Sequence, residues 1–370
     1  MAMRRCSAFG LCGIVLLGAA SWSGAEEPAA VVTAAAAEAP LRVGEERIPP
    51  DEQDTIQRLI QHQLSEMKKA AHGKELSRGQ HPKPHGILVA KFTVLNDIDP
   101  ELKVGLFGKP SSYTAVIRFS STRSLDDSMP DNHGMAIKLL GVTGAKLLEE
   151  EKDAETQDFV LVDAPTFFSK NVASLLRFGQ ASARAAQTGL EGLEILKAVA
   201  PEFPSEVGMM MQRSKVISSP FATAYFSTTP YRFGATAVKY SAQPDGQDNL
   251  RAALVEQLTT GRRPARFGFY VQRQGDPKAM LIEDATCEWT SPWERVATIE
   301  VPVQDFDFAA RERWGDALSF TPWHALKEHR PLGGINRARK VVYRASVAAR
   351  LKDSGRPPQE PTAADIPRRR

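Results

Sequence analysis

Four residues near the C-terminal end of the chain, Arg339, Tyr343, Ser346 and Arg350, are spaced by four, three and four positions. On an α-helix this spacing places all four side chains on one face. A phenol titrates near pH ~10, and a guanidinium close to it favours the ionised form. A phenolate oxygen can bind a hard metal such as ferric iron. The pattern therefore predicts a helix over 335–350 that either offers a tyrosine ligand or simply turns its basic residues to solvent.

Two further segments carry candidate residues. The stretch 78–86 reads RGQHPKPHG, and its prolines exclude the helical histidine pair of a zinc site. Its His81 precedes a predicted strand, where a rigid backbone can aim it at a buried site. In the strand 116–121, VIRFSS, Arg118 and Ser120 lie two residues apart and point to the same face. An inward arginine needs an anionic partner, either an acidic residue of the chain or a bound carboxylate.

Strands and helices must position these residues. Short runs rich in β-branched and aromatic residues, separated by Pro, Asp, Asn and Gly, predict strands at 86–95, 113–121, 134–142, 157–162, 232–240, 265–272 and 297–303. Predicted helices cover about 51–71, 172–215 and 247–259, in addition to the basic helix. Strands without βαβ alternation indicate an α+β fold, a single domain built on a large antiparallel sheet or barrel.

The composition restricts the partners. The chain has 370 residues, 42% of them hydrophobic and 25% charged, which is typical of a globular protein. The formal net charge of +3 is too small to indicate a nucleic acid partner. Beyond the N-terminal segment, no stretch reaches the ~20 apolar residues of a membrane-spanning helix. The sequence does not determine the oligomeric state.

The N-terminal segment is typical of an export signal. Residues 1–25 combine a basic start, an apolar run too short to span a bilayer and small residues at the predicted cleavage point. We expect 26–50 to be a flexible leader, 51–352 one domain and 353–370 a disordered tail. The mature chain then keeps a single cysteine, Cys287, and has no internal disulfide. Such an exported protein points to a bacterial periplasm.

Five segments occur in a telling order. They are Arg-x-x-His followed by a glycine and a strand, VIRFSS, DNHGMAIKLL, DAPTFF, and Arg-x-x-x-Tyr-x-x-Ser-x-x-x-Arg. Together they resemble the haem-binding core of the catalase superfamily, and its small, divergent catalase-like branch more than the full-length enzymes. The resemblance covers about 75–180 and 335–350. It implies a catalase-like antiparallel β-barrel core with surrounding helices, a C-terminal haem-ligand helix, and haem b with its iron as cofactor.

The resemblance also implies roles on the two sides of the haem. His81 stands at the distal histidine, which takes a proton from peroxide and returns it to the leaving oxygen. Ser120 stands at the serine that orients this histidine. Tyr343 stands at the axial phenolate that binds the iron, with Arg339 holding it ionised. Ser346 replaces a threonine one turn after the tyrosine.

Three arginines and two departures complete the comparison with the family. Arg78, Arg118 and Arg350 stand where arginines meet the haem propionates. Asp163 stands just before Pro-x-Phe-Phe, where catalases have a distal asparagine, and we expect it to substitute as a catalytic group. His133 stands where the family usually has an arginine. Both changes put fast disproportionation of hydrogen peroxide in question, whereas haem binding is little affected.

The sequence therefore favours a haem-dependent, catalase-like oxidoreductase. Its small substrate would be hydrogen peroxide or an organic hydroperoxide. One alternative within the enzyme class is a haem enzyme that rearranges fatty-acid hydroperoxides. Another is a non-enzymatic haem carrier or sensor, and the last is an α+β domain without haem. The preferred peroxide and the electron donor are not determined by the sequence.

Overall fold

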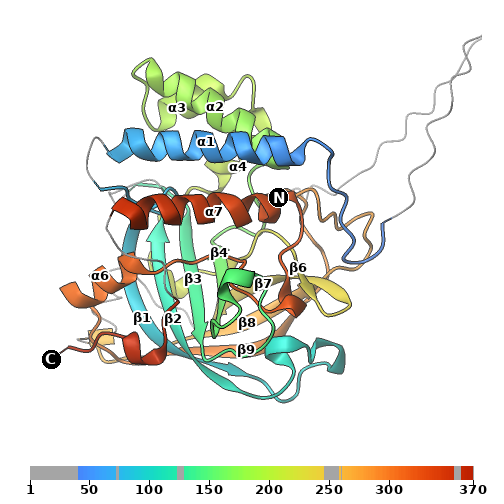
Figure 1. Ribbon diagram of the computed structural model, residues 1–370, viewed down its shortest axis with the longest axis vertical. Helices are drawn as coiled ribbons and strands as arrows, with labels where there is room; N and C mark the ends of the chain where they lie inside the picture. Colours follow the sequence, from blue (N-terminus) through green and yellow to red (C-terminus); the bar gives the residue numbers. More distant parts are fainter. Residues whose placement is uncertain are drawn as a thin grey trace, which may run out of the picture.

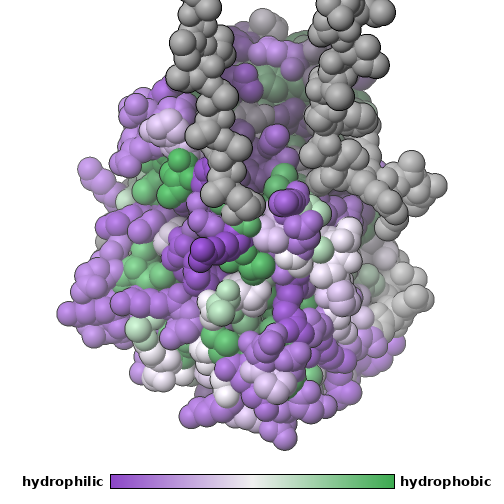
Figure 2. Space-filling model, turned by 90° about the vertical axis from the view of Figure 1, so that its right-hand side faces the viewer, coloured by the Kyte–Doolittle hydropathy of each residue, from purple (hydrophilic) through white to green (hydrophobic). Residues whose placement is uncertain are grey.

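The computed structural model describes residues 41–71, 75–122, 129–245, 258–259, 261–353 and 360–369. Among these residues, no helix has both the length and the apolar character needed to cross a membrane. Figure 2 shows a face that is mostly hydrophilic, with hydrophobic residues in small separate groups. The predicted signal peptide, 1–25, and most of the predicted helix 247–259 lie outside the described residues.

An antiparallel barrel forms the centre of the molecule. Its strands are β1 Lys83–Val94, β2 Ser112–Ser121, β3 His133–Leu140, β4 Thr156–Val162, β5 Tyr225–Phe226, β6 Tyr231–Phe233, β7 Thr236–Pro244, β8 Ala265–Arg273 and β9 Trp293–Val301. In the described chain the strand order is β5-β4-β3-β2-β1-β9-β8-β7-β6. Because β5 pairs with both β4 and β7, the eight strands other than β6 close into a ring. β6 pairs with a different part of β7. The predicted antiparallel barrel is confirmed.

The run 232–240, predicted as one strand, is instead a hairpin. Gly234 has φ +61°, a conformation open to glycine, and it turns the chain from β6 into β7. The very short β5 has no periodic signal that could have predicted it.

Helices cover one end of the barrel (Figure 1). They are α1 Glu52–Ala71, α2 Val172–Gln187, α3 Leu193–Val199 and α4 Pro204–Arg213, with α6 Ala309–Ala317 beside β1 and α7 Gly334–Asp353. The Asn171 side chain caps α2 by accepting from the Ser174 backbone N–H, and Pro204 opens α4 at a position that needs no N–H donor. The C-terminal helix α7 packs against α1 and lies between α1 and the strands (Figure 1), so one of its faces is directed toward the barrel.

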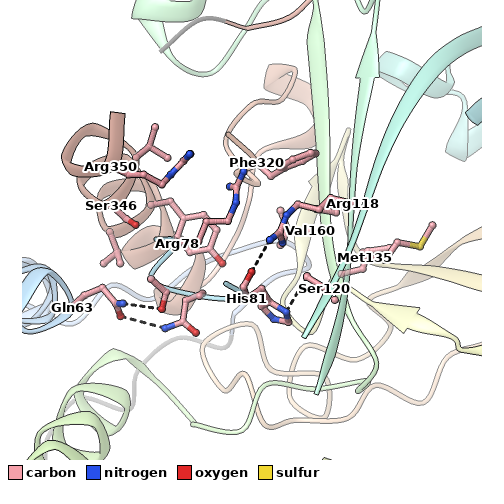
Figure 3. A pocket seen from close by; sticks show the side chains of 18 residues that line it. Gln63, Arg78, His81, Arg118, Ser120, Met135, Val160, Phe320, Ser346 and Arg350 are labelled. Atoms are coloured by element: carbon pink, nitrogen blue, oxygen red, sulfur yellow. Dashed lines mark hydrogen bonds between the residues drawn. The ribbon is translucent and has the colours of Figure 1, made fainter. Parts of the chain in front are cut away.

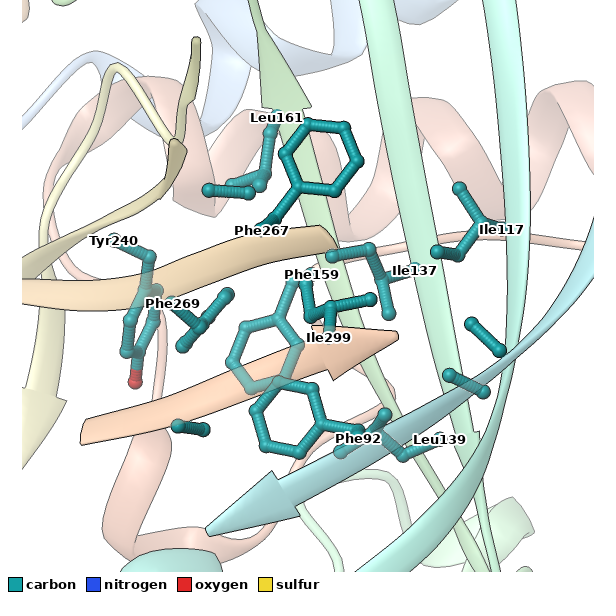
Figure 4. Packing of buried hydrophobic residues seen from close by; sticks show 14 of the residues in the cluster. Phe92, Ile117, Ile137, Leu139, Phe159, Leu161, Tyr240, Phe267, Phe269 and Ile299 are labelled. Carbon is teal, nitrogen blue, oxygen red and sulfur yellow. The ribbon is translucent and has the colours of Figure 1, made fainter. Parts of the chain in front are cut away.

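Aromatic side chains fill the interior of the barrel (Figure 4). The rings of Phe159 and Phe269 are 4.7 Å apart between centroids, and those of Phe92 and Phe269 are 5.1 Å apart. Each such pair adds about 0.5–1.5 kcal/mol beyond the burial of its area. The barrel is therefore a packed and rigid scaffold, and a ligand site must lie outside it.

Ion pairs fix the described parts of two segments that were predicted to be mobile, residues 41–50 and 360–369. In the predicted leader, Glu46 accepts from Arg330 at 2.5 Å and from Arg337 at 2.6 Å. In the predicted disordered tail, Glu360 lies 2.5 Å from the ammonium group of Lys138. Residues 41–50 and 360–369 thus pack on the domain, because charges far apart in sequence compensate the entropy cost of ordering them.

Candidate functional site

A cavity lies between the barrel and α7 (Figure 3). The segment before β1 and strands β2, β3 and β4 form one wall, and α7 forms the opposite wall. Seven of the predicted site residues line it: Arg78, His81, Arg118, Ser120, Tyr343, Ser346 and Arg350. Two predicted site residues, Asp163 and Arg339, are not part of this lining.

His81 is held in one orientation. Its backbone has φ +51°, which is strained for a residue with a side chain, and its carbonyl accepts from Arg118 Nη2 at 2.9 Å. The imidazole Nδ1 lies 3.3 Å from Ser120 Oγ, and Nε2 lies 3.3 Å from Thr122 Oγ1. Gly134 leaves room for the ring, because a Cβ there would lie 2.8 Å from His81 Nδ1. The predicted contact between His81 and Ser120 is therefore present.

The surroundings of His81 keep its imidazole neutral. Burial disfavours the charged form and, together with the positive charges of Arg118 and His133, lowers the pKa of His81 to about 4. Asp131 and Asp163 act in the opposite direction but do not outweigh burial. At neutral pH the ring can thus accept a proton.

Three arginines meet in the same cavity without a carboxylate partner. Arg78 donates to the carbonyl oxygens of Gly315 at 2.9 Å and Leu318 at 2.6 Å. Arg350 also donates to the Leu318 carbonyl, at 3.2 Å. Within the described residues, none of the three guanidinium groups forms an ion pair, and Nε of both Arg78 and Arg118 is buried without a hydrogen-bond partner.

The arginines of this cluster repel one another. Burial lowers the pKa of all three arginines, that of Arg118 to about 10. The positive charges of Arg118 and Arg350 lower the pKa of Arg78 further, and Arg350 also lowers that of Arg118. The charge of Asp316, in contrast, raises the pKa of all three. A bound group with carboxylates would relieve this repulsion and provide acceptors for the free N–H groups. The two propionates of haem are such carboxylates, so the residues present fit the implied cofactor.

The basic helix contributes as its spacing predicts, except at one position. Tyr343, Ser346 and Arg350 face the cavity from α7. Arg339 instead donates to Thr229 Oγ1 at 3.0 Å and to Asn336 Oδ1 at 3.2 Å. Among the described contacts, no hydrogen bond links Arg339 to Tyr343.

Asp163 is not among the residues that line the cavity. Its Oδ1 accepts from the His133 backbone N–H at 2.9 Å, and its Oδ2 lies 3.0 Å from His133 Nδ1. The side chain of Asp163 is fully buried. His133 thus contacts both oxygens of this carboxylate, and a catalytic role of Asp163 stays a prediction.

Solved catalase structures share this fold. A fungal catalase matches with a TM-score of 0.59 at 16% identity, over 85% of this chain and 66% of that chain. Catalase A from Saccharomyces cerevisiae matches with a TM-score of 0.58 at 16% identity, over 85% of this chain and 67% of its own. A bacterial catalase matches with a TM-score of 0.51 at 16% identity, over 86% and 64% of the two chains.

This chain has a catalase-like fold. It spans just under two thirds of the length of the fungal catalase. No protein-family model matches the sequence, and no curated protein matches it. The structural match therefore supports the fold, while the roles of individual residues depend on the geometry of the cavity.

Two of the cavity residues that sequence patterns did not identify make specific contacts in it. Gln63 on α1 donates to the Gly79 carbonyl at 3.1 Å and so holds the segment that carries His81. The ring of Phe320 faces the Arg78 guanidinium at 5.9 Å. Neither has a spacing relationship to the other site residues, because both come from elements that only the tertiary fold brings together.

Proposed function

We propose that this chain is a haem-dependent oxidoreductase that acts on hydrogen peroxide or an organic hydroperoxide. The main support is one observation: three arginines, of which Arg118 is buried, have no ion-pair partner among the described residues and share their cavity with a neutral histidine and a tyrosine. A catalase-like fold surrounds this combination. The proposal includes haem b as the resident cofactor.

Each group in the cavity would have a defined part in holding haem. Tyr343 on α7 would bind the iron through its phenolate, and Arg78, Arg118 and Arg350 would bind the propionates. When bound, haem supplies an iron that activates the peroxide oxygen and exchanges electrons with it.

His81 would move the proton. Its ring is neutral at pH 7, so a ring nitrogen can accept the proton of the incoming peroxide. With a pKa of about 4, the resulting imidazolium is acidic and readily returns the proton to the leaving oxygen. Ser120 and Thr122 would keep the ring at its position through both transfers.

The absorption spectrum of the haem-loaded protein tests the ligand. We expect a high-spin ferric spectrum that is lost or shifted in Tyr343→Phe and unchanged in Tyr240→Phe. Tyr240 is a suitable control because it is a fully buried tyrosine in the barrel core, outside the cavity lining. If wild type and Tyr343→Phe have the same spectrum, or if neither takes up haem, the proposal is wrong.

A haem carrier without enzymatic activity is the second candidate. One observation favours it: no asparagine lines the described cavity, and Asp163 points to His133 instead. His81→Ala separates the two candidates. An enzyme should lose about 10²–10⁴-fold of its peroxide turnover in this variant, whereas a carrier has no turnover that depends on His81.

A further inference from the structure

We propose that the buried residues His133 and Asp163 form a positioning pair for His81. The pair fixes the backbone beneath the His81 imidazole, and the Asp163 carboxylate stabilises the imidazolium during proton transfer. This inference rests on the proposed function for its catalytic meaning. It assigns a role to two residues that the expected distal pocket does not use.

Three contacts lock the two residues together. Besides the two hydrogen bonds to its carboxylate oxygens, Asp163 donates its own backbone N–H to the His133 carbonyl at 3.0 Å. Because an ionised carboxylate only accepts, the hydrogen bond at 3.0 Å requires the proton on His133 Nδ1. The start of β3 is thereby tied to the end of β4 at a fully buried point.

The next residue of β3 connects this pair to His81. Gly134 follows His133 and pairs with Ser120 on β2. A Cβ on Gly134 would lie 2.8 Å from His81 Cε1 and 3.0 Å from Ser120 Oγ. The Gly134 backbone is thus in van der Waals contact range of both groups that define the position of the imidazole. A shift of His133 by a few tenths of an ångström would be transmitted directly to His81.

The pair also acts on His81 through its charges. Asp163 raises the pKa of His81, and His133 lowers it. The other charged groups facing His81 are Arg118 from β2 and Asp131 just before β3. The Asp163 carboxylate therefore favours the protonated state of His81, and His133 opposes this effect.

Few other groups affect the pair itself. Lys215 Nζ lies 3.9 Å from Asp163 Oδ2, on a side chain that is half exposed. From β1, the ring of His85 lies 6.5 Å from that of His133. From β5, Tyr225 also faces Asp163, and the charge of Asp163 adds to burial in raising the pKa of the Tyr225 phenol. Substitution of Asp163 and substitution of His133 should therefore shift the His81 pKa in opposite directions.

The first test uses the haem-free protein, in which the His81 imidazole is titrated by NMR. Asp163→Asn removes the anion, so we expect the His81 pKa to fall by about half a pH unit or more. His133→Gln removes a group that lowers the His81 pKa, so we expect this pKa to rise by a similar amount. If Asp163→Asn does not fold, the upward shift in His133→Gln decides alone. Equal or same-direction shifts in the two variants overturn the proposal.

Asp158→Asn is the matched control. Asp158 also lies on β4 and also binds a histidine, with Oδ2 2.8 Å from His324 Nδ1, but it does not act on His81. We expect it to leave the His81 titration unchanged. A shift as large as that in Asp163→Asn would show a general effect of disturbing β4 and would contradict the proposal.

The second test measures the pH profile of peroxide turnover in the haem-loaded variants. We expect the acid limb of kcat/KM to move to lower pH in Asp163→Asn and to higher pH in His133→Gln, with the haem spectrum unchanged. A purely structural pair would lower activity in both variants without moving the limb, and this result would overturn the positioning role. If neither wild type nor the variants bind haem, only the proposed function is contradicted. The order of the His81 pKa values measured by NMR does not depend on haem.

Discussion

Glu360 Oε2 lies 2.5 Å from the Nζ atom of Lys138, a fully buried lysine on β3. The same carboxylate oxygen accepts from Thr156 Oγ1 at 2.6 Å, and the lysine also pairs with Asp158 at 2.8 Å. The Lys138 ammonium lies 5.6 Å from the ring centroid of Phe320, which lines the cavity. Glu360 therefore anchors the segment 360–369 to β3 and β4, and its partner Lys138 lies beside a residue of the candidate site.

This contact predicts a large loss of stability in Glu360→Gln. The substitution keeps the shape of the side chain but leaves Lys138 with one negative partner fewer in a buried position. We expect the free energy of unfolding to fall by about 3 kcal/mol. Urea unfolding measures it, with Glu66→Gln as control, because Glu66 and Lys69 form an exposed pair on α1 that is worth less than about 0.5 kcal/mol. A change as small as that of the control would show that Glu360 does not stabilise the fold.

The same cluster predicts how stability depends on pH. Burial raises the pKa of Glu360, but Lys138 and His324 outweigh burial and lower it to about 2. The contribution of Glu360 to stability is therefore present above its unfolded pKa of ~4.5 and is lost as the pH falls towards 2.

Burial and Lys138 lower the pKa of His324, but Asp158 and Glu151 raise it to about 9. The contribution of His324 to stability is complete below its unfolded pKa of ~6.5 and is lost as the pH rises through 9.

His324→Gln should separate the two limbs. We expect this variant to be less stable than wild type at pH 6 and to lose the decline in stability between pH 6.5 and 9, while the acid limb remains. Thermal unfolding midpoints measured from pH 3 to pH 10 provide the test. An unchanged alkaline limb in the variant would mean that His324 is not the group responsible.

The periods of helices and strands explain which site residues could be predicted. Tyr343 and Arg350 reach one cavity because seven residues make nearly two helical turns, and Arg118 and Ser120 share a face because strands alternate. The direction of Asp163 could not be predicted, because His133 reaches it only through the pairing of β3 with β4. The place of Glu360 depends on a partner 222 residues away, which no local pattern encodes.

Substitution of Arg350 should weaken haem binding without a large change in the stability of the fold. Arg350→Met removes one charge from the arginine cluster, so we expect haem binding to weaken about 10- to 100-fold, as for the loss of one charge-assisted contact. The haem-free protein should keep its stability within about 1 kcal/mol, because the variant also removes repulsion with Arg78 and Arg118.

A haem titration followed by absorbance gives the affinity of the Arg350→Met variant. Arg344→Met is the control on the same helix, since its side chain is 66% exposed and pairs with Glu150 at the surface. Equal affinities for the two variants would exclude Arg350 from the binding of propionates.

Gly134→Ala predicts a loss of turnover without a loss of cofactor. The added Cβ would lie 2.8 Å from His81 Nδ1 and 3.0 Å from Ser120 Oγ, so the imidazole must move. A displacement of this size can cost about 10²-fold in rate, whereas α7 and the arginines are not touched. We expect peroxide turnover to fall by that order while the haem spectrum and affinity stay as in wild type. The control is Gly208→Ala in α4, where a Cβ meets nothing within 4 Å and turnover should not change. Normal turnover in Gly134→Ala would mean that the rate does not depend on the position of His81, and the proposed proton transfer would have to be assigned to another group.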